Sequence, residues 1–250
     1  MDTLIVVPAR IASTRLPNKI IADIGGKPLI VHTWESVMSA KVGDVIVACD
    51  SKEIAEKIEK AGGTAIITDP NIPSGSDRVF SAYKIFGKPY KFIINVQGDM
   101  PFVESQIIQE TAYLIKYRKF DITTIASEVK DDTYSHTQVV KPVIAFENTQ
   151  DKNNQIGRAL YFSRSPVPFG GPYYKHIGIY GFRVESLEKF VSLPQGNLEK
   201  IEKLEQLRAL ENNMTIGIKI LDLDSPISVD TFDDLQNARE YYSMNNIFQK

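Results

Sequence analysis

Residues 3–19, TLIVVPARIASTRLPNK, join an apolar run to a polar loop. The run Thr3–Val7 is short and rich in β-branched residues, which predicts a buried strand. The loop that follows has no acidic residue and holds three cations, Arg10, Arg15 and Lys19. In a parallel sheet this loop lies at the carboxyl end of its strand, where ligands of such sheets bind. The cluster predicts an anion site, and the alternative is a solvated loop whose cations pair with acids elsewhere.

The first half of the chain alternates between runs of this kind and segments with helical spacing. The further strand-like runs are residues 44–49, 64–68, 91–96 and 122–129. The helical segments are residues 28–41, 51–62, 76–87 and 105–119. Such alternation predicts parallel strands joined by right-handed crossovers. We therefore expect an α/β fold of the Rossmann-like, doubly wound type, with a mixed but mainly parallel sheet.

The pattern changes after Val129. Three strand-like segments follow, separated by polar or Gly/Pro-rich residues: 139–148, 159–169 and 174–183. They predict a β-rich insertion over about residues 130–182. Residues 197–213 then predict one helix, because Ile201, Leu204, Leu207 and Leu210 recur at helical spacing. A strand at 215–223 and a helix at 232–242 complete the pattern, and without a linker or repeat we expect a single domain over residues 1–250.

Composition excludes several classes of protein. The 250 residues are 43% hydrophobic and 24% charged, with a net charge of -2, which is ordinary for a globular protein. The sequence has no long basic run of the kind that predicts binding to nucleic acid or to an anionic membrane. It also has no apolar stretch of the roughly 20 residues that span a bilayer. The single cysteine, Cys49, fits a reducing compartment, and the amino-terminal residues do not resemble a secretion signal. We therefore expect a soluble cytoplasmic protein. Neither G-x-G-x-x-G nor the phosphate-loop motif occurs, which argues against a dehydrogenase.

Two aspartates follow predicted strands. In NVQGDMPF, residues 95–102, Asp99 projects from a strand's carboxyl end and suits a hard cation such as Mg²⁺. In ISVDTFDDL, residues 227–235, Asp230 is a candidate second ligand, although Asp222 and Asp224 compete with it. The alternative for both Asp99 and Asp230 is a turn or cap at the start of a following helix.

The segment PSGSDRV, residues 73–79, has two interpretations. Ser74 or Ser76 could cap a helix that begins near Asp77. Alternatively, the hydroxyls, the backbone amides and Arg78 could read the polar edge of a base.

Seven stretches together resemble one known family. In chain order they are PARIASTRLPNK, SGSDR, NVQGDMP, RALYFSRSPVP, KHIGIYGFR, IEKLEQLR and SVDTFDDL. They are similar to segments of the 3-deoxy-manno-octulosonate (Kdo) cytidylyltransferases, the bacterial CMP-Kdo synthetases of lipopolysaccharide assembly. The resemblance runs from about residue 3 to about residue 240. Its first loop is shared with the wider nucleotidyltransferase superfamily, whereas HIGIYGFR and EQLR are more specific to the Kdo branch.

The resemblance implies a fold of the nucleotide-diphospho-sugar transferase type and a reaction. The anomeric hydroxyl of Kdo attacks the α-phosphorus of CTP, giving CMP-Kdo and pyrophosphate, with Mg²⁺ as the cofactor. It also implies a homodimer, with the β-rich insertion contributing to the sugar pocket and to the dimer interface.

The same resemblance assigns site residues. It implies that Lys19, Asp99 and Asp230 are catalytic and that the two aspartates bind the metal. The implied nucleotide-binding residues are Pro8, Ala9, Arg10, Ser13, Arg15, Lys19, Asp50, Ser74, Asp77, Arg78 and Gln97. The implied sugar-binding residues are Gln97, Arg158, Arg164, His176, Tyr180, Glu205 and Gln206, with Arg164 as a partner for the Kdo carboxylate.

Several of these residues have plainer interpretations from the sequence alone. His176 and Tyr180, four apart on a predicted strand, share a face and could be ordinary sheet residues. Glu205 and Gln206 lie on the polar side of the predicted helix, where solvated side chains are the default.

The sequence departs from the family pattern at four positions. Met100 stands where the family commonly has glutamate, Ser76 and Cys49 where it commonly has threonine, and Phe169 where it commonly has tryptophan. Because Met100 lies beside a metal aspartate, a related 2-keto acid sugar of the amino-Kdo or sialic acid type is an alternative substrate. A non-catalytic nucleotide-binding protein on the same scaffold is an alternative of another class.

Overall fold

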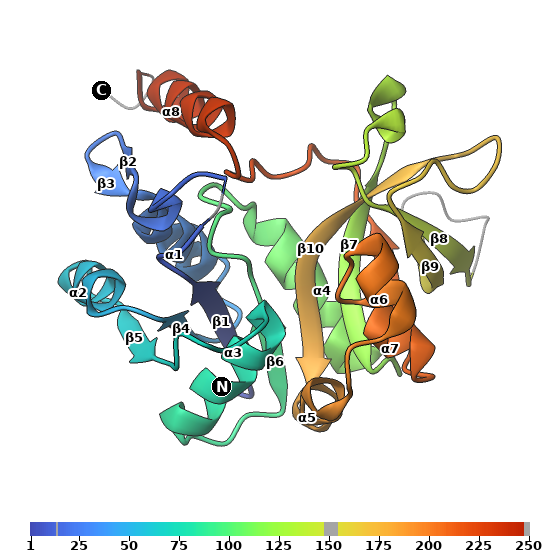
Figure 1. The fold of residues 1–250 in the computed structure, drawn as a ribbon, viewed down its shortest axis with the longest axis horizontal. Coiled ribbons are helices and arrows are strands. Elements are labelled where there is room, and N and C mark those ends of the chain that lie inside the picture. The colour runs from blue at the N-terminus through green and yellow to red at the C-terminus, as the bar shows by residue number, and fades with distance from the viewer. Residues whose placement is uncertain (14, 148–154, 248–250) are drawn as a thin grey trace. The chain divides into compact units, whose positions relative to one another are not determined.

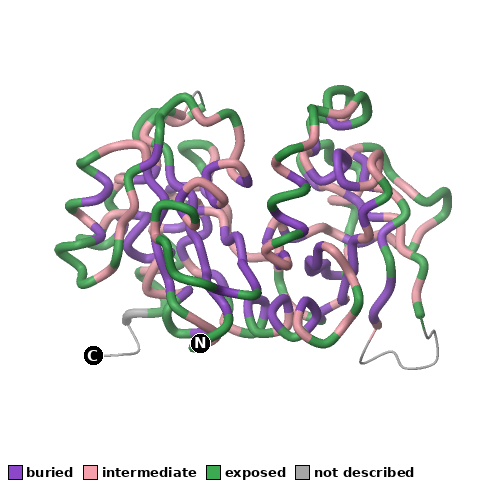
Figure 2. Tube along the Cα trace, turned by 90° about the horizontal axis from the view of Figure 1, so that it is seen from below, coloured by how far each residue is buried: buried purple, intermediate pink, exposed green. Residues whose placement is uncertain are grey.

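The computed structural model describes residues 1–13, 15–147 and 155–247 (Figure 1). The chain forms two compact units. Unit 1 consists of Met1–Tyr90, Asn95–Ile108 and Pro226–Lys250, and unit 2 of Lys91–Ile94 and Gln109–Ser225. The buried residues follow the strands of each unit, whereas exposed residues are frequent in the loops and outer helix turns (Figure 2).

Unit 1 contains three parallel strands in the order β5-β4-β1. They are β1 (Thr3–Ala9), β4 (Asp44–Cys49) and β5 (Thr64–Ile67). All seven residues of β1 are buried, as its apolar sequence predicts. The other elements of this unit are η1 (Lys19–Ile21), β2 (Asp23–Ile24), β3 (Lys27–Pro28), α1 (Leu29–Ser39), α2 (Lys52–Lys60), α3 (Gly75–Phe86) and α8 (Phe232–Ile247). Strand β6 (Phe92–Asn95) and helix α4 (Ser105–Tyr117) contribute residues to both units.

Helix α2 of unit 1 begins where the sequence supplies a cap. Ser51 accepts a hydrogen bond from the backbone N–H of Ile54 at the start of α2. The buried side of α2 is made of Ile54, Ala55 and Ile58, in the i, i+1, i+4 spacing of an amphipathic helix.

Cys49, at the end of β4, is fully buried. Burial raises the pKa of its thiol to about 11, so it is protonated and unreactive at neutral pH.

Unit 2 contains a mixed sheet in the order β10-β7-β11-β9-β8. Strands β7 (Ile122–Glu128) and β11 (Ile216–Ile220) are parallel. Strand β10 (Tyr174–Arg183) is antiparallel to β7, β9 (Ile156–Ser163) to β11, and β8 (Lys141–Phe146) to β9. The helices of this unit are η2 (Asp132–Ser135), α5 (Val184–Ser192), α6 (Asn197–Glu202) and α7 (Leu207–Glu211). The expected α/β class with a mixed sheet is confirmed.

Strands β8 and β10 fall in two of the segments predicted for the β-rich insertion, whereas β9 begins at Ile156, before the predicted segment 159–169, and ends at Ser163. The last residue of the first predicted segment, Asn148, lies outside the described residues.

The prediction of one helix over residues 197–213 is wrong. The chain leaves helical geometry at Lys203, whose φ of 55° is left-handed, and α7 begins only at Leu207. The predicted apolar side is therefore not continuous, because Ile201 is 76% exposed whereas Leu204 and Leu207 are buried.

A buried ion pair joins the two short helices. The Arg208 guanidinium donates to both carboxylate oxygens of Glu199, at 2.9 and 2.7 Å, and both side chains are buried. Glu211 accepts the backbone N–H groups of Leu198 and Glu199 at the start of α6. These tertiary contacts stabilise the break between α6 and α7. They cannot be predicted from the spacing of apolar residues in the sequence.

No helix in the described ranges combines the length and the apolarity needed to cross a bilayer.

Candidate active site

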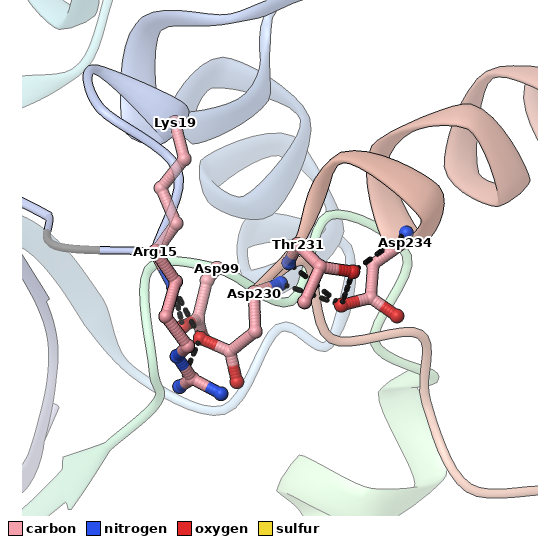
Figure 3. Close-up of polar contacts among 6 residues, drawn as sticks. All are labelled: Arg15, Lys19, Asp99, Asp230, Thr231 and Asp234. Carbon is pink, nitrogen blue, oxygen red and sulfur yellow. Dashed lines mark hydrogen bonds and ion pairs between the residues drawn. The ribbon is translucent and has the colours of Figure 1, made fainter.

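Three side chains from distant parts of unit 1 meet at one point (Figure 3). The Lys19 ammonium donates to Asp99 Oδ2 at 2.7 Å and to Asp230 Oδ1 at 2.8 Å. The Arg15 guanidinium lies 2.9 Å from the same Asp230 oxygen. The loop after β1 thus meets the segment after β6 and the segment before α8 in a cluster of two carboxylates and two cations.

The backbone around Gly98 explains how Asp99 reaches this point. After β6 the chain runs beside β1, where the N–H of Val96 donates to the carbonyl oxygen of Val6 at 3.1 Å. A Cβ on Gly98 would lie 2.6 Å from the carbonyl oxygen of Pro8, which is closer than such atoms come in proteins. The Thr33 hydroxyl holds this tight approach by donating to the Gly98 carbonyl at 2.9 Å. The glycine is therefore required by contact with the end of β1.

The capping interpretation of Asp230 is wrong, because two neighbours form the cap of α8. The N–H of Asp234 donates to Thr231 Oγ1 at 3.2 Å, and Asp234 Oδ2 accepts from the N–H of Thr231 at 2.8 Å (Figure 3). Burial alone would raise the pKa of Asp234, but its hydrogen bonds from Thr231 and Asp230 lower it. The Asp230 carboxylate is left to face the cations.

The structure also decides between the competing interpretations of Asp99, Asp222 and Asp224. Asp99 lies well before the first residue of α4, Ser105, so it is not the cap of that helix. Asp222 pairs at 2.7 Å with Lys130 on the surface of unit 2, and Asp224 is exposed in the same unit. Of the three candidates for a second carboxylate, Asp230 is the one that joins Asp99.

The charge of Lys19 is stabilised by the cluster. Burial by itself lowers the pKa of this ammonium, but the charges and hydrogen bonds of Asp99 and Asp230 outweigh it and raise the pKa. The side chain is only 12% exposed, so these interactions are poorly screened by water. Lys19 is therefore a permanent positive charge at neutral pH.

The two aspartates fit a metal ion that is shared with phosphate. The described part of the chain has no group of three or more His, Cys, Asp or Glu side chains able to enclose a metal. Asp99 and Asp230 nevertheless converge on one cationic nitrogen, so their oxygens already surround a positive charge. Mg²⁺ is commonly held by one or two carboxylates together with substrate phosphates and water. The donor set therefore suits Mg²⁺ and not an all-protein cage.

Arg78 presents unsatisfied donors in the interior of unit 1. Its side chain is fully buried, and Nη1 donates to Thr68 Oγ1 at 2.5 Å and to the Asp69 carbonyl at 3.3 Å. Its Nε and Nη2 find no hydrogen-bond partner among the described residues. Burial lowers the pKa of this guanidinium, which the charge of Asp50 partly offsets. Because leaving a buried charged donor unpaired is costly, the arrangement indicates an acceptor supplied from outside the chain.

Ser74 is the cap of α3, and Ser76 is not. The Ser74 hydroxyl oxygen accepts from the Asp77 N–H at 3.2 Å, and the hydroxyl donates to the Asp77 carboxylate at 2.6 Å. The capping interpretation of this segment is therefore correct for Ser74, and it leaves Arg78, one turn into the helix, as the group with free donors.

The remaining predicted nucleotide-binding residues of unit 1 lie on the loop after β1 and at the ends of strands. Pro8 and Ala9 are buried at the end of β1, whereas Arg10 is exposed and Ser13 is partly buried. Asp50 accepts the backbone N–H of Ile11 at 2.9 Å, so it ties the cationic loop to the end of β4. The Gln97 amide donates to Asn95 Oδ1 at 3.3 Å.

Four of the predicted sugar-binding residues lie close together in unit 2. The rings of His176 and Tyr180 are 5.4 Å apart, which confirms that they share a face of β10. Burial lowers the pKa of His176 to about 3, so its ring is neutral at physiological pH. Burial and then the negative charge of Glu205 raise the pKa of Tyr180, which places Glu205 near the phenol.

Gln206 is next to Glu205 on the turn between α6 and α7. The expectation of a solvated side chain is wrong for Gln206, which is 5% exposed and whose amide nitrogen has no hydrogen-bond partner among the described residues. Glu205 is partly buried and lies 3.8 Å from Arg208. The break at Lys203 is what turns these two residues away from the outer face of a continuous helix.

Arg164 holds that turn through backbone carbonyls. It donates to the carbonyl oxygens of Glu202 at 2.9 Å, Thr137 at 3.0 Å and Lys203 at 3.4 Å. Its own N–H donates to the Glu202 carboxylate at 3.0 Å. Arg158, on β9, is exposed. Contact of Arg164 with a sugar carboxylate stays a prediction.

Sequence reasoning missed the residues that support these groups. Glu202 accepts from Ser163 and from Arg164, and the fully buried Lys141 ammonium donates to the carbonyls of Val139 and Arg164. Thr124 contacts His176. The one available signal was a polar residue within an apolar strand, as in ITTIASE.

Comparison with known proteins identifies the family. The cytidylyltransferase family model matches residues 4–216. The 3-deoxy-manno-octulosonate cytidylyltransferase of Paramagnetospirillum magneticum is 46% identical over 243 residues, covering 96% of this chain and 97% of that protein. The protein of the same name from Rickettsia bellii is 42% identical over 249 residues and covers 98% of each.

Solved structures agree with these relatives. A CMP:2-keto-3-deoxy-manno-octonic acid synthetase complexed with CTP superposes with a TM-score of 0.86 at 30% identity, covering 98% of this chain and 100% of that one. A 4-diphosphocytidyl-2C-methyl-D-erythritol synthase from Anaerococcus prevotii, 16% identical over 96% of this chain and 97% of that one, has a TM-score of 0.61 and shares the fold. Together with the motifs and the fold, these similarities show that the chain belongs to the 3-deoxy-manno-octulosonate cytidylyltransferase family.

Proposed function

We propose that this protein transfers CMP from CTP to the anomeric hydroxyl of Kdo, giving CMP-Kdo and pyrophosphate for lipopolysaccharide assembly. The observation that carries the proposal is the convergence of Lys19, Asp99 and Asp230 in a chain 42–47% identical to enzymes of this name. Nucleotidyl transfer depends mainly on alignment and on neutralisation of phosphate charge, and this cluster offers both.

The cationic loop binds the triphosphate in this mechanism. Arg10 and Arg15 have the planar, forked guanidinium group that pairs with phosphate oxygens. Lys19, positive at neutral pH, stabilises the charge that develops on the leaving pyrophosphate. Asp99 and Asp230 would hold Mg²⁺, which supplies further charge neutralisation at phosphate oxygens when it is bound.

The bond changes are simple. The sugar's anomeric oxygen forms a bond to the α-phosphorus, and the bond from that phosphorus to the pyrophosphate oxygen breaks. The hydroxyl proton leaves to a base or to water, and no redox partner is needed. The chain's contribution is therefore binding, orientation and electrostatics.

Recognition of the cytosine base is assigned to Arg78. Its Nε and Nη2 are buried donors without a hydrogen-bond partner in the described residues, and the base of CTP carries carbonyl and ring-nitrogen acceptors. Ser74 and Asp77 support this role by fixing the first turn of α3.

The sugar is assigned to the predicted sugar-binding residues of unit 2. The Gln206 amide and the neutral His176 ring are polar groups suited to sugar hydroxyls. Arg158 and Arg164 are the candidates for the carboxylate of the sugar acid.

The direct test is an assay with a panel of sugar acids. The purified protein is incubated with CTP and Mg²⁺ plus Kdo, an amino-Kdo or a sialic acid, and pyrophosphate and CMP-sugar are measured. We expect the highest kcat/KM with Kdo and no turnover when the metal is chelated. A preference for the amino sugar would overturn Kdo as the substrate, and it is the alternative that Met100 leaves open.

The same assay separates catalysis from simple nucleotide binding. If the protein is a non-catalytic relative, calorimetry will show CTP binding while no sugar acid releases pyrophosphate. Turnover with any member of the panel excludes that alternative.

We further propose that the protein works as a homodimer in the cytoplasm. The buried, reduced Cys49 suits a reducing compartment, and Phe169 is a fully exposed aromatic residue in the β-rich insertion. Light scattering should give twice the chain mass of 28.1 kDa. A monomer at the concentrations used for the assay would contradict the dimer without affecting the reaction.

A further inference from the structure

Thr124 lies opposite an irregularity in strand β10. Tyr180 pairs with Thr124 of β7 and Ile177 with Ile125, so two residues of β10, Gly178 and Ile179, have no counterpart in β7. Such a bulge re-aims the groups of its strand. Here the carbonyl oxygens of Ile177 and Ile179 accept from the Thr124 hydroxyl, at 3.0 and 2.7 Å.

The same hydroxyl also contacts a histidine. Thr124 Oγ1 is 3.0 Å from Nε2 of His176, and the threonine is fully buried. A hydroxyl has one proton and two lone pairs, whereas a carbonyl oxygen only accepts. The proton of Thr124 is therefore committed to the carbonyls of the bulge, and its lone pair faces the imidazole. A hydrogen bond between the two side chains then requires that Nε2 carry the proton.

The surroundings of the ring favour a single proton. His176 lies with its ring centroid 5.0 Å from that of Phe162 and 5.4 Å from that of Tyr180. Burial among these rings lowers the pKa of His176 to about 3. A neutral imidazole with its proton on Nε2 has an unprotonated Nδ1, which is a hydrogen-bond acceptor.

We propose that Thr124 is a positioning residue that holds His176 as the Nε2–H tautomer, so that Nδ1 accepts a hydrogen bond from a hydroxyl group of the sugar. The assignment to the sugar rests on the proposed function. A carboxylate has no proton to donate, so it cannot form a hydrogen bond with the unprotonated Nδ1 of His176. The acid group of the substrate therefore requires a cationic partner elsewhere. Thr124 thereby sets the orientation of the sugar without touching it.

The first experiment needs no substrate and no variant of Thr124. Protein labelled with ¹⁵N-histidine gives two ring-nitrogen signals for each of its three histidines, His32, His136 and His176. The signals of His176 are assigned as those lost in His176→Gln. We expect a protonated Nε2 and an unprotonated Nδ1 in the ligand-free protein. A protonated Nδ1 or a charged ring at neutral pH overturns the proposal.

A second experiment tests the threonine with a matched control. Thr124→Val removes the hydroxyl at nearly constant volume and is expected to convert part of the His176 signal to the Nδ1–H tautomer. Thr124→Ser restores the hydroxyl and should restore the wild-type spectrum. Thr123→Val is the control, because Thr123 is a fully buried neighbour in β7 whose hydroxyl donates to the Thr111 carbonyl and not to His176. If both valine variants leave the His176 signals unchanged, Thr124 does not set the tautomer.

Kinetics test the consequence for the sugar. In Thr124→Val the KM for the sugar should rise about tenfold, the effect of one lost net hydrogen bond, with the KM for CTP unchanged. An unchanged KM for the sugar, or an equal rise for both substrates, overturns the assigned role of Nδ1. The two proposals fail separately: absence of turnover with every sugar acid removes the proposed function, whereas the spectrum of the ligand-free protein decides the tautomer.

Discussion

The backbone N–H of Val229 donates a hydrogen bond to the carbonyl oxygen of Asp99 at 2.9 Å. This contact ties together two segments that are far apart in the sequence, and each carries one carboxylate of the cluster. Asp99 and Asp230 are therefore placed by backbone pairing, before any ligand binds. A site built in this way loses little entropy when a metal and phosphate arrive.

The first prediction concerns the charge of Asp99. Asp99→Asn keeps the side-chain shape and its contact with Lys19 but removes one of two carboxylates, so we expect kcat to fall at least about 100-fold, as for loss of a key electrostatic group. The free energy of unfolding should change by no more than about 1 kcal/mol, since the residue is partly exposed. Pyrophosphate release and urea denaturation measure the two effects.

Asp222→Asn is the matched control for this variant. The Asp222 side chain is 89% exposed and pairs with Lys130 at the surface. Such a pair contributes little, so both activity and stability should stay at wild-type values. A large loss of stability in Asp99→Asn would instead assign that carboxylate a structural role.

The second prediction concerns Gly98. In Gly98→Ala the new methyl group would meet the Pro8 carbonyl oxygen at 2.6 Å, so one of the two backbone segments must move. We expect a loss of about 1–3 kcal/mol of stability together with reduced turnover, because the movement displaces Asp99. Gly178→Ala serves as the stability control, since among the described residues, its chain neighbours aside, no atom lies within 4 Å of a Cβ at that position. Equal stability of the two variants would contradict the close approach.

The third prediction concerns the ion pair between α6 and α7. Arg208→Met leaves the Glu199 carboxylate buried and without its cation, which should cost about 3–5 kcal/mol. The double variant Glu199→Leu/Arg208→Met removes both charges and should be more stable than the single variant. If chemical denaturation finds the double variant as unstable as the single one, the penalty comes from lost packing against Phe190, over whose ring the guanidinium lies at 4.8 Å.

The fourth prediction concerns pH and His176. Its pKa is about 3 in the folded protein, against an ordinary value of 6.5. Between these values the unfolded chain takes up a proton that the folded protein does not, so stability falls as the pH falls through this window. The contribution is at most about 1.4 kcal/mol for each pH unit. His176→Gln should therefore lose less stability than the wild type on acidification, as measured by urea unfolding at a series of pH values.

His136→Gln is the control for that comparison, because His136 is exposed. Its stability should follow the wild-type pH dependence. Parallel curves for the wild type and His176→Gln would show that the ring of His176 is not kept neutral by the fold.

The sequence predicted those parts of the fold that depend on local periodicity. Strand β1 and helix α2 were expected because their apolar residues recur at the periods of a buried strand and an amphipathic helix. The break at Lys203 was missed, since its cause is a pair formed between Glu199 and Arg208 and a left-handed backbone that no spacing rule reports.

The site was predicted unevenly for the same reason. The cations after β1 are visible as a local cluster, but the sequence alone left Asp222, Asp224 and Asp230 as competing partners of Asp99. Only the fold decides among them, through contacts such as that of Val229 with Asp99. Thr124 and Glu202 act through other residues. For Thr124 the one available signal, a polar residue within an apolar strand, does not reveal which other residue it contacts.

The protected state of Cys49 has a practical consequence. Since the chain's single thiol is buried and its pKa is raised to about 11, maleimide reagents will find almost no native target. A cysteine introduced on the cationic loop, or on the turn after α6, can then carry a fluorophore or spin label without prior removal of the natural one. The wild-type protein is in effect a ready background for site-specific spectroscopic labelling.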